Sequence, residues 1–474
     1  MRLVGCKPWA GTFVLAAVIC WVWLAPARAD TLEGALSLAY RNNPSLNAQR
    51  AAVRATDENV PQALSGYRPK ISVNANGGEQ TMSTTSKSPS SIVPGTSVYS
   101  TLAGYNSPIS AGITATETLF NGFQTANRTR QAESQVLAAR ANLRNTEQSV
   151  LLSAVTAYMN LLRDTAILDL QRRNVEVLQE QLRQTRDRFN VGEVTRTDVA
   201  QAESSLAQGR SAVLTAEANY KASVATYRQV IGVEPSRLAP GSPVDRFSPN
   251  SLAAAIAAGT GINPSVTLAQ YNVDAALLAV KVAEGALYPT LSVTGNFTQN
   301  WLSQQSISVM NAYNASVIGT LSVPIYQGGA EYSAIRQAKE TLGQRRLDLD
   351  TARDQARQTI VQSWGLLDAA KANIEATQAQ VQAAEIALNG VREEARVGQR
   401  TTLDVLNAQQ VLVNARVAVV TAQHDRVVAS YTLLAAVGRL SPQVLGLRVP
   451  TYDARVHYEQ VRDSWLGVRT PDGR

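Results

Sequence analysis

The sequence predicts a mixed fold, in which a membrane β-barrel is joined to a long α-helical barrel and several copies of the chain build both. Two observations support this prediction. Near Gly192 and again near Gly398, 206 residues later, a very long helical pattern is interrupted by a short segment and then resumes. Pairs of segments with alternating apolar and small polar residues stand outside these helices. The chain therefore contains two tandem repeats, each with two strands and a long coiled helical hairpin.

The first 29 residues are predicted to be a secretory signal peptide. Arg2 and Lys7 precede an apolar stretch, and Ala27-Arg28-Ala29 is a typical cleavage site. Both cysteines of the chain lie in this segment. A chain cleaved after Ala29 would therefore have no disulfide, no thiolate metal site and no catalytic thiol.

Charge and hydropathy exclude several functional classes. The signal peptide holds three basic residues and no acid, so its loss lowers the formal charge from +7 to +4. The remaining charges are dispersed over helix faces, whereas nucleic-acid-binding proteins cluster them, and we expect no nucleic-acid partner. After the signal peptide, no uninterrupted apolar run approaches the ~20 residues of a membrane-spanning helix. His424 and His457 have no second ligand at metal-binding spacing, so we expect no metal, no cofactor and no enzyme site.

The first repeat is predicted to span residues 30–245. It opens with helices, and Asn43 caps the one that begins at Pro44. The stretch from Ser83 to Ser107 is rich in Ser, Thr, Pro and Gly and is predicted to be an exposed loop. The strands and the long hairpin are expected at about 70–82, 108–120 and 125–231.

The second repeat is predicted to span residues 246–440. Its Asn-Pro helix start, Asn263-Pro264, follows the first by 220 residues, from Pro44 to Pro264. Strands are expected at about 290–302 and 313–326, and the long hairpin at 329–438. The tail, residues 441–474, is polar and weakly patterned, and no role is predicted for it.

The strands alternate between one apolar and one small polar face. Ile71 and Val73, for example, alternate with Ser72 and Asn74. This period of two indicates strands between two unlike media, such as lipid and water. Aromatic residues stand near the strand ends, as in interfacial girdles (Tyr105, Phe120, Trp301 and Tyr313). A soluble β-sandwich hairpin is the alternative, because its solvated face would have the same composition.

The long helices carry a seven-residue apolar repeat. On the two return arms it consists of Val199, Leu206, Val213, Tyr220 and Tyr227, and of Leu406, Val413, Val420, Val427 and Leu434. A sustained period of seven indicates coiled packing against neighbouring helices. An outgoing helix of some 66 residues would be ~100 Å long, more than a globular domain holds.

Four membrane strands do not close a barrel, because single-chain barrels start at about eight strands. Strand edges left open in lipid would expose backbone groups, each at a cost of several kcal/mol. Several chains must therefore pool their strands, two to give eight or three to give twelve.

These motifs resemble those of TolC-type outer-membrane channels, the exit ducts of multidrug efflux pumps and type I secretion systems. The motifs are the Asn-Pro helix starts, Leu119-Phe120-Asn121-Gly122, Ile325-Tyr326-Gln327-Gly328-Gly329 and the doubled Val-Gly tips. The resemblance implies a homotrimer with a twelve-stranded barrel in outer-membrane lipid and a helical barrel through the periplasm. It also implies a passive channel, opened at its periplasmic tip by a membrane-fusion adaptor and an inner-membrane transporter of the ABC or RND type.

The tips contain two capping signatures. Thr195 with Asp198, and Thr401 with Asp404, have the spacing at which Thr caps a helix and the acid bonds back to it. Both acids would also be favoured by the positive end of the helix dipole. Capping is thus one complete interpretation of these four residues.

The resemblance adds functional roles to the tips. It implies that Asp404 lines a constriction of the lumen, where a second acid of the family is replaced by Asn407. It implies that Arg400 bonds Thr197 and Asp198 and latches neighbouring hairpins; a solvated tip charge is the alternative. Residues that shape the tip and dock an adaptor would be Val191, Gly192, Thr195, Val397, Gly398 and Thr401. Glu193 and Gln399 stand where the family often has an apolar residue, which predicts altered docking chemistry.

A periplasmic coiled-coil adaptor or scaffold without a pore is the alternative function. Such a protein normally has one hairpin flanked by compact β-domains. Two hairpins with alternating strands at their other ends favour the channel.

Overall fold

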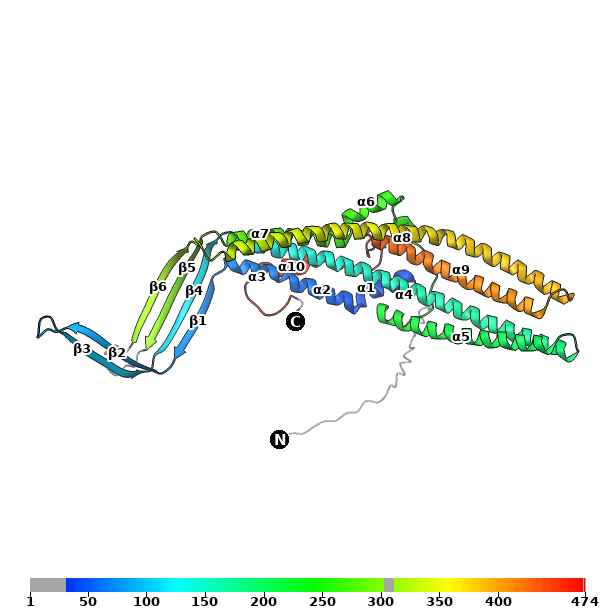
Figure 1. The fold of residues 1–474 in the computed structure, drawn as a ribbon, viewed down its shortest axis with the longest axis horizontal. Coiled ribbons are helices and arrows are strands. Elements are labelled where there is room, and N and C mark those ends of the chain that lie inside the picture. The colour runs from blue at the N-terminus through cyan, green and yellow to red at the C-terminus, as the bar shows by residue number, and fades with distance from the viewer. Residues whose placement is uncertain (1–30, 302–310, 472, 474) are drawn as a thin grey trace, which may run out of the picture.

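The structure, a computed structural model, describes residues 31–301, 311–471 and 473. The molecule is elongated, with a β-sheet at one end and the tips of two helical hairpins at the other (Figure 1). The predicted signal peptide lies outside the described residues. The first repeat consists of α1 (Leu32–Asn42), α2 (Pro44–Asp57), α3 (Asn59–Leu64), η1 (Ser65–Tyr67), β1 (Lys70–Gly77), β2 (Gln80–Pro89), β3 (Ser97–Asn106), β4 (Ile109–Asn121), α4 (Gln124–Asn190) and α5 (Arg196–Ile231).

The second repeat returns to the same order. After η2 (Asp245–Phe247) it consists of α6 (Leu252–Ile262), α7 (Pro264–Gly285), β5 (Thr290–Trp301), β6 (Asn311–Ser322), α8 (Ala330–Arg396) and α9 (Thr402–Ala436), and α10 (Ala454–Val461) follows in the tail. The outgoing helices α4 and α8 have 67 residues each, or ~100 Å at the usual rise. Each packs against its return arm, α5 or α9.

Equivalent asparagines fasten both repeats. The side-chain oxygen of Asn43 accepts hydrogen bonds from the amides of Ser45 at 3.0 Å and Leu46 at 3.2 Å, which caps α2. Its amide nitrogen donates to the carbonyl oxygen of Val230, near the end of α5, at 3.1 Å. Asn263 caps α7 and donates to Ala436 at the end of α9 in the same way, at 3.0 Å. The predicted Asn-Pro starts therefore cap one helix and bind the end of another.

Four antiparallel strands form one sheet in the order β1-β4-β5-β6. Across it, Val73, Ile113 and Phe297 are aligned on one face, and their sequence neighbours Ser72, Thr114 and Asn296 on the other. The Thr114 hydroxyl donates to the side-chain oxygen of Asn296 at 3.0 Å. These apolar side chains are exposed, and no second sheet covers them among the described residues, so the fold lends no support to the sandwich alternative.

The strand boundaries differ from the prediction in three places. The predicted strand at 70–82 ends at Gly77, because Gly77-Gly78 interrupts it. The predicted loop from Ser83 to Ser107 is instead the β2–β3 hairpin, which turns at Gly95 (φ +87°) and extends beyond the sheet (Figure 1). The strand predicted at 313–326 ends at Ser322, since Pro324 has no N–H to donate. Residue 302, the expected end of the strand preceding it, lies outside the described residues.

The main hydrophobic core lies midway along the helices. It joins α1, α4, α5 and α9 with the linker, the segment between α5 and α6. Its largest buried side chains are Tyr158 and Tyr227. The Tyr158 hydroxyl donates to the carbonyl oxygen of Ala239 in the linker at 2.6 Å. The predicted heptad stripe contributes here, because Tyr227, Val427 and Leu434 belong to this core.

One helical stretch, Leu252–Gly285, is long and apolar enough to cross a membrane by length and composition alone. The sequence analysis did not single it out. It is divided into α6 and α7 at Asn263-Pro264, and both helices pack against α8. This packing assigns the stretch to the helical body.

The tail has more structure than its sequence indicated. Helix α10 packs on α2, where Nδ1 of His457 lies 3.1 Å from Oδ2 of the buried Asp57. Arg140 of α4 lies 3.8 Å from the other oxygen of this carboxylate. Burial raises the pKa of Asp57, while the bond to His457 and the charge of Arg140 act in the opposite direction.

Two glycines meet where the strands join the helices. Gly122, between β4 and α4, has φ +62°, and a Cβ placed on it would lie 2.2 Å from the carbonyl oxygen of Gly285 at the end of α7. A Cβ on Gly285 would in turn lie 2.6 Å from the carbonyl oxygen of Gly122. The first repeat and the second are therefore in backbone contact at the base of the sheet.

We expect Gly122→Ala to destabilise the protein by about 1–3 kcal/mol, because the methyl group meets backbone that cannot move aside and L-residues disfavour positive φ. The melting temperature of the detergent-extracted protein measures this effect. Gly343→Ala is the control, since a Cβ on this glycine of α8 meets nothing within 4 Å. A Gly122→Ala protein as stable as the control would contradict the close approach.

Candidate functional site

Each hairpin turns at its tip through the same backbone motif. Gly192 (φ +81°) and Gly398 (φ +78°) follow the last residues of α4 and α8. The amide of Glu193 donates to the carbonyl oxygen of Arg188 at 2.9 Å, and the amide of Gln399 donates to that of Glu394 at 2.9 Å. This is a Schellman ending, in which glycine supplies the left-handed conformation at no steric cost.

Both return arms begin with a capping box. Asp198 Oδ2 accepts from the amide of Thr195 at 2.8 Å and from its hydroxyl at 2.7 Å, and the Asp198 amide donates to that hydroxyl at 3.4 Å. Thr401 and Asp404 repeat the arrangement at 3.0, 2.9 and 3.2 Å. These bonds lower the pKa of both carboxyls. The capping interpretation is confirmed for both acids.

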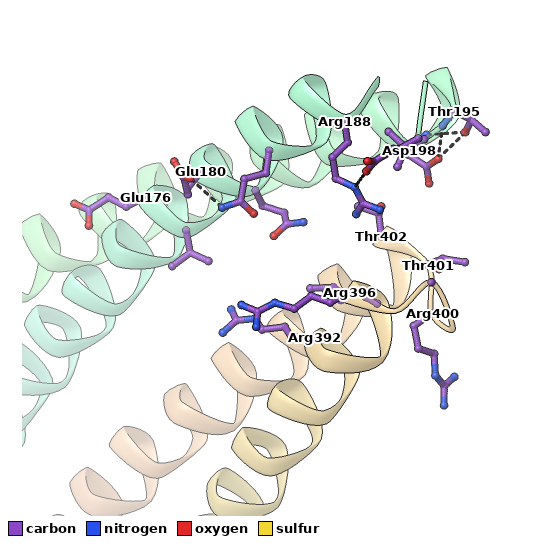
Figure 2. A pocket seen from close by; sticks show the side chains of 18 residues that line it. Glu176, Glu180, Arg188, Thr195, Asp198, Arg392, Arg396, Arg400, Thr401 and Thr402 are labelled. Atoms are coloured by element: carbon purple, nitrogen blue, oxygen red, sulfur yellow. Dashed lines mark hydrogen bonds and ion pairs between the residues drawn. The ribbon is translucent and has the colours of Figure 1, made fainter. Parts of the chain in front are cut away.

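An ion pair closes each tip loop, with its charges reversed between the hairpins. In the first, Nε of Arg188 on the helix donates to Glu193 in the loop at 2.9 Å. In the second, Nε of Arg400 in the loop donates to Glu394 on the helix at 2.8 Å, which raises the pKa of Arg400. Within one chain Arg400 is thus bound to Glu394, and Figure 2 shows it pointing away from Asp198. Its predicted contact with Thr197 and Asp198 of a neighbouring hairpin stays a prediction.

The two hairpins touch just above their tips. Leu406 of α9 is buried against Leu178 and Leu182 of α4 and belongs to the same apolar cluster. Beside it, Arg392 donates to the side-chain oxygen of the buried Gln409 at 3.0 Å, and Gln409 donates to Asn174 of α4 at 3.5 Å.

This polar contact was not predicted from the sequence. Its signal was available, because Gln409 interrupts the buried stripe of α9 between Val405 and Leu412.

A cleft of about 750 Å³ separates the hairpins between this contact and the tips. Figure 2 shows α4 and α5 on one side of it and the second hairpin on the other. Charged side chains of both signs line it: Glu176, Glu180, Arg188, Glu193, Asp198, Arg392, Arg396 and Arg400. Its lining includes the tip-loop residues Glu193, Gly398 and Arg400.

The other predicted tip residues lie on the surface. Val191 and Val397, at equivalent positions, are each 71% exposed. Thr197 and Asn407 are also exposed, and Asp404 is half-exposed. Asp404 and Asn407 stand three residues apart on α9 and therefore share one face of that helix. Within the described ranges, no three His, Cys, Asp or Glu side chains come together as a metal site.

Comparison with known proteins identifies the family. The family model for outer membrane efflux protein matches residues 35–233 and 261–439. The chain is 44% identical over 451 residues to the outer membrane efflux protein BepC of Brucella suis biovar 1, and the alignment covers 94% of each chain. It is 26% identical over 433 residues to the outer membrane protein TolC of Escherichia coli K12, with 88% of this chain and 84% of TolC covered. The solved structure of the Campylobacter jejuni CmeC outer membrane channel shares its fold, with a TM-score of 0.73 at 18% identity over 91% of this chain and 89% of CmeC.

The family match includes both hairpins. It excludes a pore-free adaptor or scaffold, the alternative left by the sequence. Transport proteins of this type carry out no enzymatic reaction. With its four membrane strands, its long periplasmic helices and its matched tips, the chain belongs to the outer membrane efflux protein family and is an outer-membrane channel for efflux or type I secretion.

Proposed function

We propose that three copies of this chain form a passive export duct whose periplasmic end is held shut by the hairpin tips. A periplasmic membrane-fusion adaptor opens it, and an inner-membrane transporter of the ABC or RND type supplies the energy. The observation that supports this best is the pair of matched hairpins, which touch above their tips and are separated by a polar cleft between this contact and the tips. Channels of the TolC family are trimers. The proposal for this chain concerns how the hairpin tips close the duct and where the adaptor docks.

The open flanks of the single chain support the trimer. Strands β1 and β6 form the two edges of the sheet, and neither has a second partner strand among the residues that the structure describes. Helix α4 packs between α2 and α7, whereas its equivalent α8 packs on α7 and α6 of its own repeat. Exposed apolar side chains remain on α8 (Leu347, Leu366 and Ile386). The first-repeat helices of a neighbouring chain would fill the flank of α8, and the neighbour's β1 would pair with β6.

The tips supply the docking surface in this proposal. Val191 and Val397 are exposed at equivalent positions, and the cleft behind them presents both signs of charge. Exposed apolar side chains rimmed by polar ones mark interaction sites. Thr195 and Thr401 fix the end of each tip loop by capping α5 and α9. Gly192 and Gly398 adopt the positive φ that reverses the chain. Since Glu193 is engaged by Arg188, it offers the partner an ion pair in place of an apolar contact.

We expect native mass spectrometry of the detergent-extracted protein to show three copies of the chain. Photo-crosslinkers at Val191 and Val397, activated in cells, should add a periplasmic adaptor to the same trimer. A crosslinker at Ile92, which is exposed between β2 and β3, is the control and should not capture it. A stable inserted monomer would overturn the assembly, and crosslinks confined to the control would overturn docking at the tips.

Asp404 and Asn407 would set the ion preference of the closed end. Both lie on one face of α9, within two turns of the tip. Threefold symmetry would place three Asp404 carboxylates around the axis. Within each chain, the hydrogen bonds from Thr401 lower the pKa of this carboxyl and favour its charged form. A ring of like charges in a narrow aperture focuses its field on passing ions.

Asp404→Asn should therefore lower the preference for cations, and Asn407→Asp should raise it. Reversal potentials in planar bilayers under a salt gradient measure both effects. Glu459→Gln removes an exposed acid of α10, away from the tips, and is the control. If selectivity is the same in all three proteins, Asp404 serves only as a cap.

The resting lock would depend on Arg400. In one chain it is paired with Glu394, and both side chains are about half exposed, at 52% and 46%. Such a pair is weak and exchangeable. In the closed trimer, we propose, the guanidinium also bonds Thr197 and Asp198 of an adjacent first hairpin, so that the same contact recurs at three places.

Arg400→Ala should leave the trimer intact and raise its resting conductance, with greater entry of large antibiotics into cells. Combining it with Asp198→Ala should add little, because both changes break one contact. Glu394→Gln separates the two roles of Arg400, since it removes only the bond within the loop. If Glu394→Gln opens the channel as much as Arg400→Ala does, the loop ion pair holds the tip and the contact between hairpins is disproved.

A further inference from the structure

The end of the chain follows the first-repeat helices toward the sheet. The amide of Tyr452 donates to the hydroxyl of Tyr40 in α1 at 3.2 Å. His457 then meets Asp57 at the end of α2, and Tyr458 packs against the apolar cluster that includes Val60 of α3. Successive tail residues thus contact elements progressively closer to β1.

Arg68 holds the last of these contacts. Its Nη1 donates to the carbonyl oxygen of Ser464 at 2.7 Å, and its guanidinium lies over the ring of Trp465, 4.5 Å from the centroid. Arg68 stands two residues before Lys70, the first residue of β1. Trp465 is therefore fixed at the end of the sheet where the strands meet the helices.

The residues beyond this point are apolar and unpacked. Trp465 is 67% exposed, Leu466 93% and Val468 101%. Single exposed apolar side chains are ordinary, but three within four residues, beside a membrane domain, form a patch that no other part of the described chain covers. We name residues 464–469 the C-terminal apolar segment.

Other residues at this end of the sheet have the character of a membrane interface. Exposed aromatic side chains flank the strands on the helix side: Tyr67, Phe123, Tyr288 and Tyr326. Tyr and Trp favour the headgroup level, where the ring is in a partly apolar layer and its polar atom is hydrated. Tyr67 is adjacent in sequence to Arg68, so Trp465 lies close to this level.

Basic side chains accompany the segment. Arg68 and Lys70 precede and open β1, and Arg469 follows Val468. Asp463, an acidic residue, stands just before the segment. Basic residues next to an interfacial aromatic suit the phosphates of phospholipid headgroups.

We propose that the C-terminal apolar segment binds the periplasmic leaflet of the outer membrane. Trp465, Leu466 and Val468 enter the headgroup and upper acyl region, and Arg68 positions Trp465 there. Phospholipid is the occupant because the segment is continuous with the membrane strands through Arg68 and combines apolar with basic residues. The tail then anchors the helical body to the bilayer at a point outside the barrel.

The test uses the emission of Trp465 in the full protein, purified from outer membranes and reconstituted in phosphatidylcholine vesicles. Trp301 and Trp364 are replaced by Phe, and the difference between this protein and the same protein with Trp465→Phe isolates the signal of Trp465. Vesicles with and without acyl-chain-brominated phosphatidylcholine measure lipid contact, and acrylamide measures water contact. The channel conductance of each protein shows that it has assembled.

We expect brominated lipid to remove emission from Trp465 and acrylamide to have little effect. A matched protein in which only Trp364 of α8 is retained among these three should keep its emission in brominated vesicles. Quenching of Trp465 by acrylamide alone would place the segment in water and overturn the proposal. Quenching by neither agent would mean that a neighbouring chain covers it, which also overturns the proposal.

Discussion

The structure depends on one constraint, that backbone groups inside a bilayer must find hydrogen-bond partners within protein. Strands β4 and β5 have hydrogen-bonded partner strands on both sides. Strands β1 and β6 each have a partner strand on one side only in the described chain. Its two faces are unlike, with Val73, Ile113 and Phe297 on one and Thr114 and Asn296 on the other. Such a sheet is stable only when other chains continue it. The need for several chains thus follows from hydrogen bonding, before any helix is considered.

The tandem repeat gives the helices of both halves equivalent contacts, as it does the strands. Asn43 and Asn263 perform the same two tasks in the two repeats, capping one helix and binding the end of a return arm. The repeats are fused where Gly122 meets Gly285, at the base of the sheet. The second repeat offers Gly328 and Gly329 at the equivalent turn, and a Cβ there meets nothing within 4 Å in the single chain. Each chain thus makes the glycine contact once, between its own repeats, and keeps the turn at Gly328 and Gly329 free for a neighbouring chain. A closed ring of identical chains needs one such free surface in each chain.

Features set by local sequence were predictable, and those set by contacts distant in sequence were not. The caps at Thr195 and Thr401 and the turns at Gly192 and Gly398 are decided within a few residues, and the structure has them as predicted. The Ser/Thr composition of the β2–β3 hairpin suits a loop as well as a strand, so it predicts a loop where cross-strand pairing forms a hairpin. The bond between His457 and Asp57 joins residues 400 positions apart. A hydrophobic period in the sequence does not indicate a contact between such distant residues, so the packing of the tail could not be predicted.

The contacts near the tips are of two kinds, those within one hairpin and those between hairpins, and only the second kind resists separation of the hairpins. The Schellman endings, the capping boxes and the loop ion pairs are all internal to one hairpin, so each hairpin can move without breaking them. Between the hairpins lie Leu406, buried against α4, and the bond from Gln409 to Asn174. Exposing a buried leucine costs about 1.5–3 kcal/mol, and a typical hydrogen bond contributes about 1 kcal/mol. A partner that separates the hairpins must offset roughly this much in each chain by binding the open form more tightly. The cleft lies directly below these contacts, where such a partner would reach them first.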